Sequence, residues 1–391
     1  MPKFAVIFEA SPFDRKGLFN AVHNRVKHLL ASGKCEVDVY CIHSKDNAFT
    51  RKVRHTPEVQ DVDHVVLDGI KYNLLWYRFS IIDHMTVEKL HFRPLLFGKF
   101  LDMNVSVLKD YDAVLSHSFT GGLFAYEAFR RFGIPYYASW HGSDVHTHPW
   151  RVPVILEDTV KIMENAVCNF FVSKALMTYS SKISLNAVKK VLYNGVSEDF
   201  VKYDDDKRVE LRTSYGLTAG EKVVAYVGNL SAVKNVLVLP EVFAEVSRRY
   251  SGPLKFWIVG DGKQRQQLSE SVSGLSSGDS GLSVRFFGNL PSEEMPGIMN
   301  CVDVLVLPSK NEGLGMVCAE AIRCGANAVG SAVGGIAEVV GAENVVPHGE
   351  GFVSGMAEKI AHMLSSEVKQ VLPAGIDWSK TASAELAELL R

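Results

Sequence analysis

The chain has 391 residues, of which 47% are hydrophobic and 22% charged. This composition at this length favours two globular domains, and a formal net charge of −2 argues against a dedicated nucleic-acid-binding protein. The six cysteines show no Cys-x-x-Cys spacing, so neither a disulfide framework nor a zinc site is indicated. No apolar stretch approaches the roughly 18 residues of a membrane span, and the first one, Phe4 to Phe8, is too short for a secretion signal. We therefore expect a soluble, cytoplasmic protein.

Short apolar runs alternate with amphipathic segments through the first half of the chain. In order, the pattern predicts a strand over 4–8, a helix over 18–30, and strands over 37–42, 111–115 and 135–140, with a helix at 123–132 between the last two. Alternation of buried strands with helices is typical of a parallel sheet that is covered on both faces.

The same pattern restarts after a polar segment. Residues 197–215 hold an acidic run and little apolar sequence, and we interpret them as a linker. Strands are then expected over 222–228, 254–260, 283–287 and 302–307, with a helix between the first two that ends near residue 250. The chain is therefore predicted to be an α/β protein of two doubly wound domains, residues 1–195 and 196–375.

The two halves differ in charge. Residues 1–195 carry a formal charge of +5, and residues 196–391 carry −7. A basic first domain would suit an anionic acceptor or an anionic membrane surface, although ordinary scatter of surface charge explains the difference equally simply.

Ligands of open parallel sheets bind beyond the carboxyl ends of the strands, so the loops there are the first candidates for a site. The loop after the first strand lacks Gly-x-Gly-x-x-Gly, and the chain has no P-loop motif, which argues against a dehydrogenase and a P-loop kinase. Gly17 at a helix start either lets a phosphate approach the backbone or only forms a turn. His141, directly after the strand that ends at Trp140, is placed where its imidazole can bind substrate hydroxyls.

The segment 307–321 carries the strongest signal. A strand ends at Leu307, and Gly313 and Gly315 free the backbone before a helix. The bare amides at such a helix start suit a phosphate or a sugar oxygen. Glu312 precedes the helix and Glu320 lies within it, so two acceptors flank a run of donors.

These residues resemble a known family. Glu312 and Glu320, separated by seven residues inside Pro-Ser-x-x-Glu-Gly-x-Gly, resemble the Glu-x7-Glu motif of retaining glycosyltransferases of family 4, which have the two-domain GT-B fold. Gly228-Asn229-Leu230 with Lys234 is similar to the family's phosphate-binding segment, and the loop at 141–144 is similar to its histidine loop. The similarity is dense over 228–340 and sparse before it.

Two positions depart from the family pattern. Lys16-Gly17 stands where the family has a glycine pair, and Asn229 stands where it commonly has an arginine. One positive charge is thus absent from the phosphate site, and we expect rearranged diphosphate contacts, with Lys234 and the hydrogen bonds of Asn229 remaining.

The resemblance implies a metal-independent, retaining hexosyltransferase without a cofactor. It implies two Rossmann-like domains facing a cleft, a donor-binding second domain, and a C-terminal helix over 376–391 that returns to the first domain. Lys234 would neutralise the departing diphosphate, Glu320 would hold the ribose, and Glu312 and His141 would contact the transferred sugar. The residues implied in donor binding are Gly17, Asn229, Lys234, Asn289, Leu290, Glu312, Gly313, Leu314, Gly315 and Glu320.

The implied donor is a nucleotide-diphosphate sugar, and the implied acceptor is a hydroxyl of a polysaccharide or lipid-linked glycan precursor. Two other functions stay open on the sequence. A nucleotide-sugar epimerase also uses two such domains, but no carboxylate pair for acid–base chemistry on a ring carbon is evident. A catalytically silent subunit that binds sugar nucleotides would be consistent with Asn229.

Overall fold

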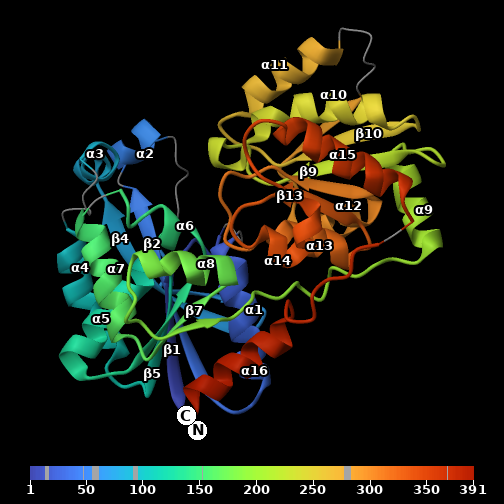
Figure 1. The fold of residues 1–391 in the computed structure, drawn as a ribbon. Coiled ribbons are helices and arrows are strands. Elements are labelled where there is room, and N and C mark those ends of the chain that lie inside the picture. Colours follow the sequence, from blue (N-terminus) through green and yellow to red (C-terminus); the bar gives the residue numbers. More distant parts are fainter. Residues whose placement is uncertain are drawn as a thin grey trace. The chain divides into compact units, whose positions relative to one another are not determined.

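The chain divides into two units, each built on its own sheet with helices packed against it (Figure 1). The computed structural model describes residues 1–13, 17–46, 48–54, 61–90, 96–151, 153–276, 283–367 and 369–391. The first unit comprises Met1–Tyr193 together with Trp378–Arg391, and the second comprises Asn194–Asp377.

The first unit contains an eight-stranded sheet in the order β3-β4-β2-β1-β5-β6-β7-β8. Its pairings are parallel except for β3, which runs antiparallel to β4. Because β1 lies between β2 and β5, the chain reverses its direction of winding there, and the loops after β1 and β5 border the place where such sheets bind ligands. The strands are β1 (Lys3–Glu9), β2 (Glu36–Asp46), β3 (His64–Leu67), β4 (Ile70–Phe79), β5 (Ala113–His117), β6 (Tyr136–Trp140), β7 (Cys168–Phe171) and β8 (Lys189–Val191).

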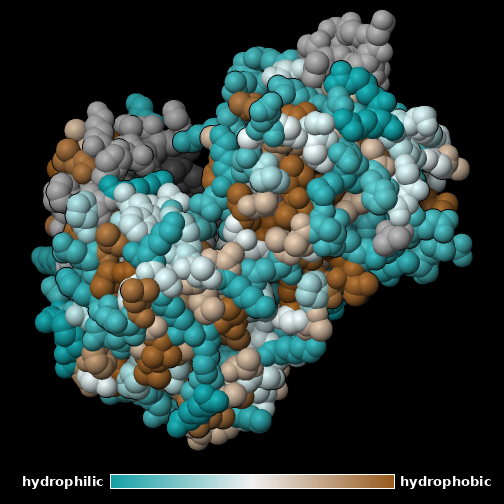
Figure 2. Space-filling model, viewed as in Figure 1, coloured by the Kyte–Doolittle hydropathy of each residue, from teal (hydrophilic) through white to brown (hydrophobic). Residues whose placement is uncertain are grey.

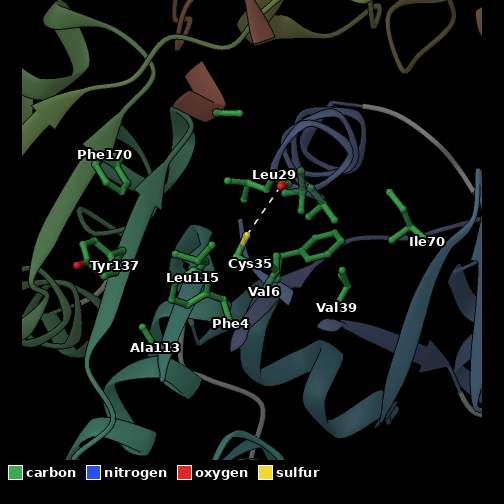
Figure 3. Packing of buried hydrophobic residues seen from close by; sticks show 14 of the residues in the cluster. Phe4, Val6, Leu29, Cys35, Val39, Ile70, Ala113, Leu115, Tyr137 and Phe170 are labelled. Carbon is green, nitrogen blue, oxygen red and sulfur yellow. Dashed lines mark hydrogen bonds between the residues drawn. The ribbon is translucent and has the colours of Figure 1, made fainter. Parts of the chain in front are cut away.

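Helix α16 closes the core of the first unit although it is the last element of the chain. Its Ala382 and Leu386 join the buried cluster that Phe4, Leu29 and Leu115 form between sheet and helices (Figure 3). The helices of this unit are α1 (Leu18–Ala31), α2 (Ala48–Arg54), α3 (Ile81–Lys89), α4 (Phe97–Asn104), α5 (Ser118–Phe132), α6 (Ser143–His146), α7 (Pro153–Asn165), α8 (Lys174–Tyr179) and α16 (Trp378–Leu389).

The second unit contains a six-stranded parallel sheet in the order β11-β10-β9-β12-β13-β14. This order is that of a doubly wound Rossmann sheet, and its switch point lies between β9 and β12. The strands are β9 (Lys222–Val227), β10 (Leu254–Val259), β11 (Val284–Gly288), β12 (Val304–Leu307), β13 (Asn327–Ser331) and β14 (Val345–Val346). The four middle strands are almost entirely buried, as expected when helices cover both faces.

The helices of the second unit connect its strands in the βαβ manner. They are α9 (Asp205–Ser214), α10 (Leu239–Arg249), α11 (Arg265–Ser276), α12 (Met295–Cys301), α13 (Met316–Arg323), α14 (Ile336–Val340) and α15 (Phe352–Ser365). Helices α10 and α15 pack against each other, and α13 packs against α14 (Figure 1).

The predicted linker over 197–215 is wrong in part, because it contains helix α9. Asp204 caps this helix by accepting the Lys207 N–H at 2.8 Å. None of its residues is buried, and Arg208 and Arg212 hold it to Asp303 through ion pairs of 3.3 and 3.2 Å. Helix α9 is held by ion pairs and has no apolar stripe, so its sequence shows no hydrophobic periodicity. For that reason it was not predicted.

Hydrophilic side chains predominate on the face drawn in Figure 2, with apolar ones interspersed. Within the described part of the chain, no helix has both the length and the apolar character needed to cross a membrane. The six cysteines are free and buried.

Candidate active site

The loop after β9 begins with a close contact between two backbones. Gly228 has a φ of +150°, and a Cβ on Gly260, in the loop after β10, would lie 2.0 Å from the carbonyl oxygen of Gly228. The two loops therefore pack together without side chains between them. Asn229 follows, and its carbonyl accepts the Tyr226 hydroxyl at 2.9 Å. This contact fixes the backbone from which the loop runs toward Lys234.

Lys234 ends a short 3-10 helix at Ala232–Lys234, and Asn235 turns the chain after it with a φ of +54°. Asparagine tolerates this left-handed conformation better than most residues. The Lys234 Nζ donates to Glu312 Oε1 at 2.5 Å, and the Lys310 N–H donates to the Val233 carbonyl at 2.8 Å. The loops after β9 and β12 are thus joined at the switch point of the sheet.

Glu312 is held from three sides. Ser309 Oγ donates to the same Oε1 atom at 3.0 Å, and the Ser309 carbonyl accepts from Ser331 and lies 2.9 Å from His348 Nε2. Gly334 packs against the Glu312 backbone so closely that a Cβ there would lie 1.8 Å from the Glu312 carbonyl oxygen. The Glu312 side chain is 13% exposed and that of Lys234 is 27% exposed, so both remain accessible to a ligand.

The turn after Glu312 leads into helix α13. Gly315, with a φ of +85°, precedes Met316 at the start of this helix, whose first N–H groups have no acceptor within it. Leu314 is buried beneath the turn. The segment 313–315 therefore offers backbone donors next to the carboxylate of Glu312.

Glu320 lies within α13 and is partly buried. Burial raises its pKa to about 8, so the carboxyl group is largely protonated at pH 7. Burial raises the pKa of the neighbouring Cys318 as well, and the charges of Glu312 and Glu320 both add to that shift. Both glutamates of the Glu-x7-Glu spacing thus raise the pKa of the same buried thiol, that of Cys318.

Asn289 and Leu290 lie at the same edge of the sheet, directly after β11 (Val284–Gly288). Asn289 is exposed and Leu290 partly buried. Their role in donor binding stays a prediction.

His141 belongs to the first unit and follows β6. Asp144 accepts the N–H groups of His141, at 3.0 and 3.1 Å to its two oxygens, and of Gly142 at 2.7 Å. Burial outweighs these bonds and raises the pKa of Asp144 to about 6. Burial, and then the positive charge of Arg25, lowers the pKa of His141 to about 3. His141 is therefore a neutral imidazole at pH 7.

His117, which lies beside His141, was not predicted from the sequence. It ends β5, and its Nδ1 lies 3.1 Å from His141 Nε2, with the two rings stacked at a centroid distance of 5.3 Å. It follows a buried strand next to the switch point of the first sheet, so the criterion that singled out His141 would also have found it. The next residue, Ser118, has a φ of +62°, a strained conformation of the kind that collects at functional sites.

Gly17 precedes α1 with a φ of +48°, and a Cβ there would meet no atom within 4 Å. The conformation, and not crowding, favours glycine at this position. Lys16, the neighbour in the departure from the family's glycine pair, lies outside the described residues.

Of the residues predicted for the site, the structure brings Lys234, Glu312 and the 313–315 turn together, with Glu320 nearby on α13. Gly17 and His141 lie in the first unit, at the carboxyl edge of its own sheet.

Known proteins are similar to parts of this chain. Residues 207–372 match the family model described as glycosyl transferases group 1. The 2-deoxystreptamine N-acetyl-D-glucosaminyltransferase of Streptomyces fradiae is 37% identical over 145 residues, 35% of this chain and 33% of that protein. The N-acetyl-alpha-D-glucosaminyl L-malate synthase of Bacillus anthracis is 27% identical over 46% of this chain and 45% of its own. The matched part thus spans a third to a half of these curated relatives.

Solved structures match over the whole chain. Sucrose-phosphate synthase from Thermosynechococcus elongatus superposes with a TM-score of 0.68 at 20% identity, covering 100% of this chain and 95% of the other. Anabaena HepE, solved with UDP and glucose, gives 0.69 at 18% identity, covering 100% and 99%. The chain therefore has the GT-B fold of two Rossmann-like domains, and the predicted fold class is confirmed.

Proposed function

We propose that this protein is a retaining glycosyltransferase of family 4 that moves a sugar from a nucleotide-diphosphate sugar to a hydroxyl acceptor. The observation that carries the proposal is the contact of Lys234 with Glu312 at the switch point of the second sheet, beside the 313–315 turn. A cation and backbone amides suit a diphosphate, and a carboxylate beside them suits sugar hydroxyls. The group 1 family match covers this same region.

The roles follow from charge. Breaking the bond between sugar and diphosphate builds negative charge on the leaving phosphate, and Lys234 with the amides of 313–315 stabilises that charge. Glu312 holds hydroxyls of the transferred sugar, and Glu320 holds the ribose. His141, as a neutral imidazole, contacts the sugar from the first domain. No protein nucleophile is assigned, so the acceptor attacks the face that the phosphate leaves, and the departing phosphate takes the acceptor's proton.

Product analysis tests this proposal. Anabaena HepE was solved with UDP and glucose, so UDP-sugars are the first donors to offer, with a panel of glycan and lipid-linked acceptors. Sugar on an acceptor supports transfer, an altered free donor indicates an epimerase, and binding without turnover indicates a silent subunit. Mass spectrometry identifies the product, and NMR of its anomeric centre reports retention.

Glu320 gives a pH-dependent prediction. Because the buried carboxyl has a pKa of about 8 and its anion is the better acceptor for two ribose hydroxyls, UDP affinity should increase as the group ionises. From about pH 7 to pH 9 we expect close to a tenfold gain in the wild type and none in Glu320→Gln. Isothermal titration calorimetry with UDP measures it. Parallel pH dependence in both proteins would exclude Glu320 as the ribose ligand.

Metal independence is a second prediction. With Lys234 and the amides supplying the positive charge, the enzyme should need no divalent cation. Transfer rates should be unchanged in excess chelator, and adding magnesium or manganese should not raise them. A strict requirement for either metal would overturn the proposed role of Lys234 as the principal cation.

We also propose a cytoplasmic location with peripheral contact to an anionic membrane through the first domain. Residues 1–195 carry a formal charge of +5, and exposed apolar side chains lie on or beside α2 to α4, at Phe49, Ile82, Met85, Leu96 and Met103. Flotation with vesicles of anionic and of neutral lipids tests this contact, which should weaken as salt is added.

A further inference from the structure

Arg25 places a positive charge in the interior of the first unit. It lies on α1 with 2% of its surface exposed, and its Nη1 donates to Ser139 Oγ at 2.8 Å. Its Nε lies 3.2 Å from Glu385 Oε2 on α16, whose side chain is 1% exposed. Burying two charges is costly, and replacing such a pair by apolar side chains is often neutral for stability. Stability alone is therefore a weak reason for this pair.

A hydrogen bond connects the guanidinium to the strand that leads to His141. Ser139, its hydrogen-bond partner, stands two residues before His141 on β6 and is paired with His117 in the sheet. Arg25 thus contacts the residue that links the two strand ends carrying the histidines. Glu385 contacts a different atom of the same guanidinium, Nε, so the last helix of the chain holds this charge in place.

The geometry of the histidine pair restricts its protonation. Nδ1 of His117 and Nε2 of His141 lie 3.1 Å apart, a distance at which one nitrogen donates and the other accepts. If both rings were imidazolium, two N–H groups would face each other and the bond would be lost. At least one ring must therefore be neutral, and an additional fixed cation nearby makes protonation of either ring harder.

The charged groups around the pair come from three helices. Arg25 on α1 and Glu385 on α16 form an ion pair, and Asp144 on α6 accepts the His141 N–H. The two rings, from the end of β5 and from the residue after β6, contact each other. Burial contributes most to the lowered pKa of both histidines, and Arg25 is the largest charge contribution to each.

We propose that Arg25 is a positioning residue for the histidine pair, whose buried charge keeps both imidazoles neutral and hydrogen-bonded to each other. Glu385 fixes Arg25 through the Nε atom, whereas the Nη1 atom of the guanidinium donates to Ser139. The functional consequence of this inference rests on the proposed function: His141 would then contact the sugar as a neutral ring with one orientation. The C-terminal helix would thereby contribute to the site without contacting substrate.

The test is an NMR titration of the full-length protein with isotope-labelled histidine, in the absence of any substrate. His141→Asn and His117→Asn assign the two signals. In the wild type neither ring should gain a proton over the range in which a free imidazole titrates, whereas Arg25→Gln/Glu385→Gln, which removes both charges together, should raise the pKa of His141 above its value of about 3 by about 1–3 units. The expected result is an imidazolium signal in the double variant at a pH at which the wild type shows none.

Two further variants separate charge from loosened packing. Arg25→Lys keeps the cation and should keep the wild-type titration, and Glu385→Gln alone removes only the anion and should not raise either pKa. Wild-type behaviour of the double variant overturns the proposal, as does an equal rise in Glu385→Gln. If the double variant fails to fold, Arg25→Met/Glu385→Leu replaces it as an apolar pair of similar volume.

This titration does not depend on glycosyl transfer, so the two proposals can fail separately. Loss of the expected transfer activity would leave the histidine result standing. Where transfer is observed, its acid limb should move to higher pH in the double variant by the shift that NMR measures.

Discussion

Replacing Lys234 with alanine is expected to lower the rate of glycosyl transfer by about a hundredfold or more, because one preorganised donor at a developing oxyanion contributes about 2.7–4 kcal/mol. In the proposed site, Asn229 stands where the family-4 glycosyltransferases that the sequence resembles commonly have an arginine, so Lys234 would carry most of the positive charge available to the diphosphate. Initial rates at saturating donor measure the effect. A rate within about threefold of the wild type, less than 1 kcal/mol, would show that the phosphate is held elsewhere.

Asn229→Ala is the matched comparison on the same loop. The Asn229 backbone carbonyl accepts the Tyr226 hydroxyl, and this hydrogen bond is retained in the alanine variant. Its side chain can add one neutral hydrogen bond to the donor, so a loss of about 0.5–1.5 kcal/mol is expected.

A double-mutant cycle with Glu312 distinguishes two ways in which Lys234 can act. The contact between Lys234 and Glu312 means that alanine at 234 also leaves the carboxylate without its cation. If Lys234 stabilises the diphosphate directly, Lys234→Ala should still slow an enzyme that already carries Glu312→Gln. If it only positions Glu312, the double variant should be no slower than Glu312→Gln.

Most of the buried strands, among them β1, β9 and β12, could be predicted from sequence because each is a short apolar run. The buried strands β7 and β13 were not predicted, because each is short and contains an asparagine, so neither is a wholly apolar run. The antiparallel β3–β4 pair was not predicted either, although Asp68-Gly69 between them carries a strong two-residue hairpin signal, with φ values of +50° and +78°. That pair corrects the expectation of a wholly parallel first sheet. Strand β14, only two residues long, leaves no periodicity to recognise.

For the candidate site, sequence reasoning identified residues that lie at strand ends within recognisable motifs. It could not identify the contacts between distant segments that support them. Arg25 and Glu385 are separated by most of the chain, and neither lies in a motif. The raised pKa of Glu320 likewise depends on burial by the folded chain, so it could not be predicted from the sequence.

Gly334→Ala should lower the rate of glycosyl transfer by displacing Glu312, although Gly334 has no assigned contact with the substrate. The substitution adds a Cβ 1.8 Å from the Glu312 carbonyl oxygen, and the backbone must move to relieve that contact. Since displacement of a reacting group by about 1 Å can cost a hundredfold in rate, we expect a loss of that order. The free energy of unfolding of the second unit should fall by about 3 kcal/mol or more, as for other severe core changes.

Gly220→Ala provides the control, because Gly220 lies in the same unit with a φ of +84° and a Cβ there would meet no atom within 4 Å. It carries the conformational cost of alanine in a left-handed conformation, about 1–2 kcal/mol, without the contact. Denaturant unfolding and initial rates on both variants separate the two contributions. Equal losses in the two variants would mean that the close approach of Gly334 to Glu312 does not position the carboxylate, and that backbone strain alone explains the glycine.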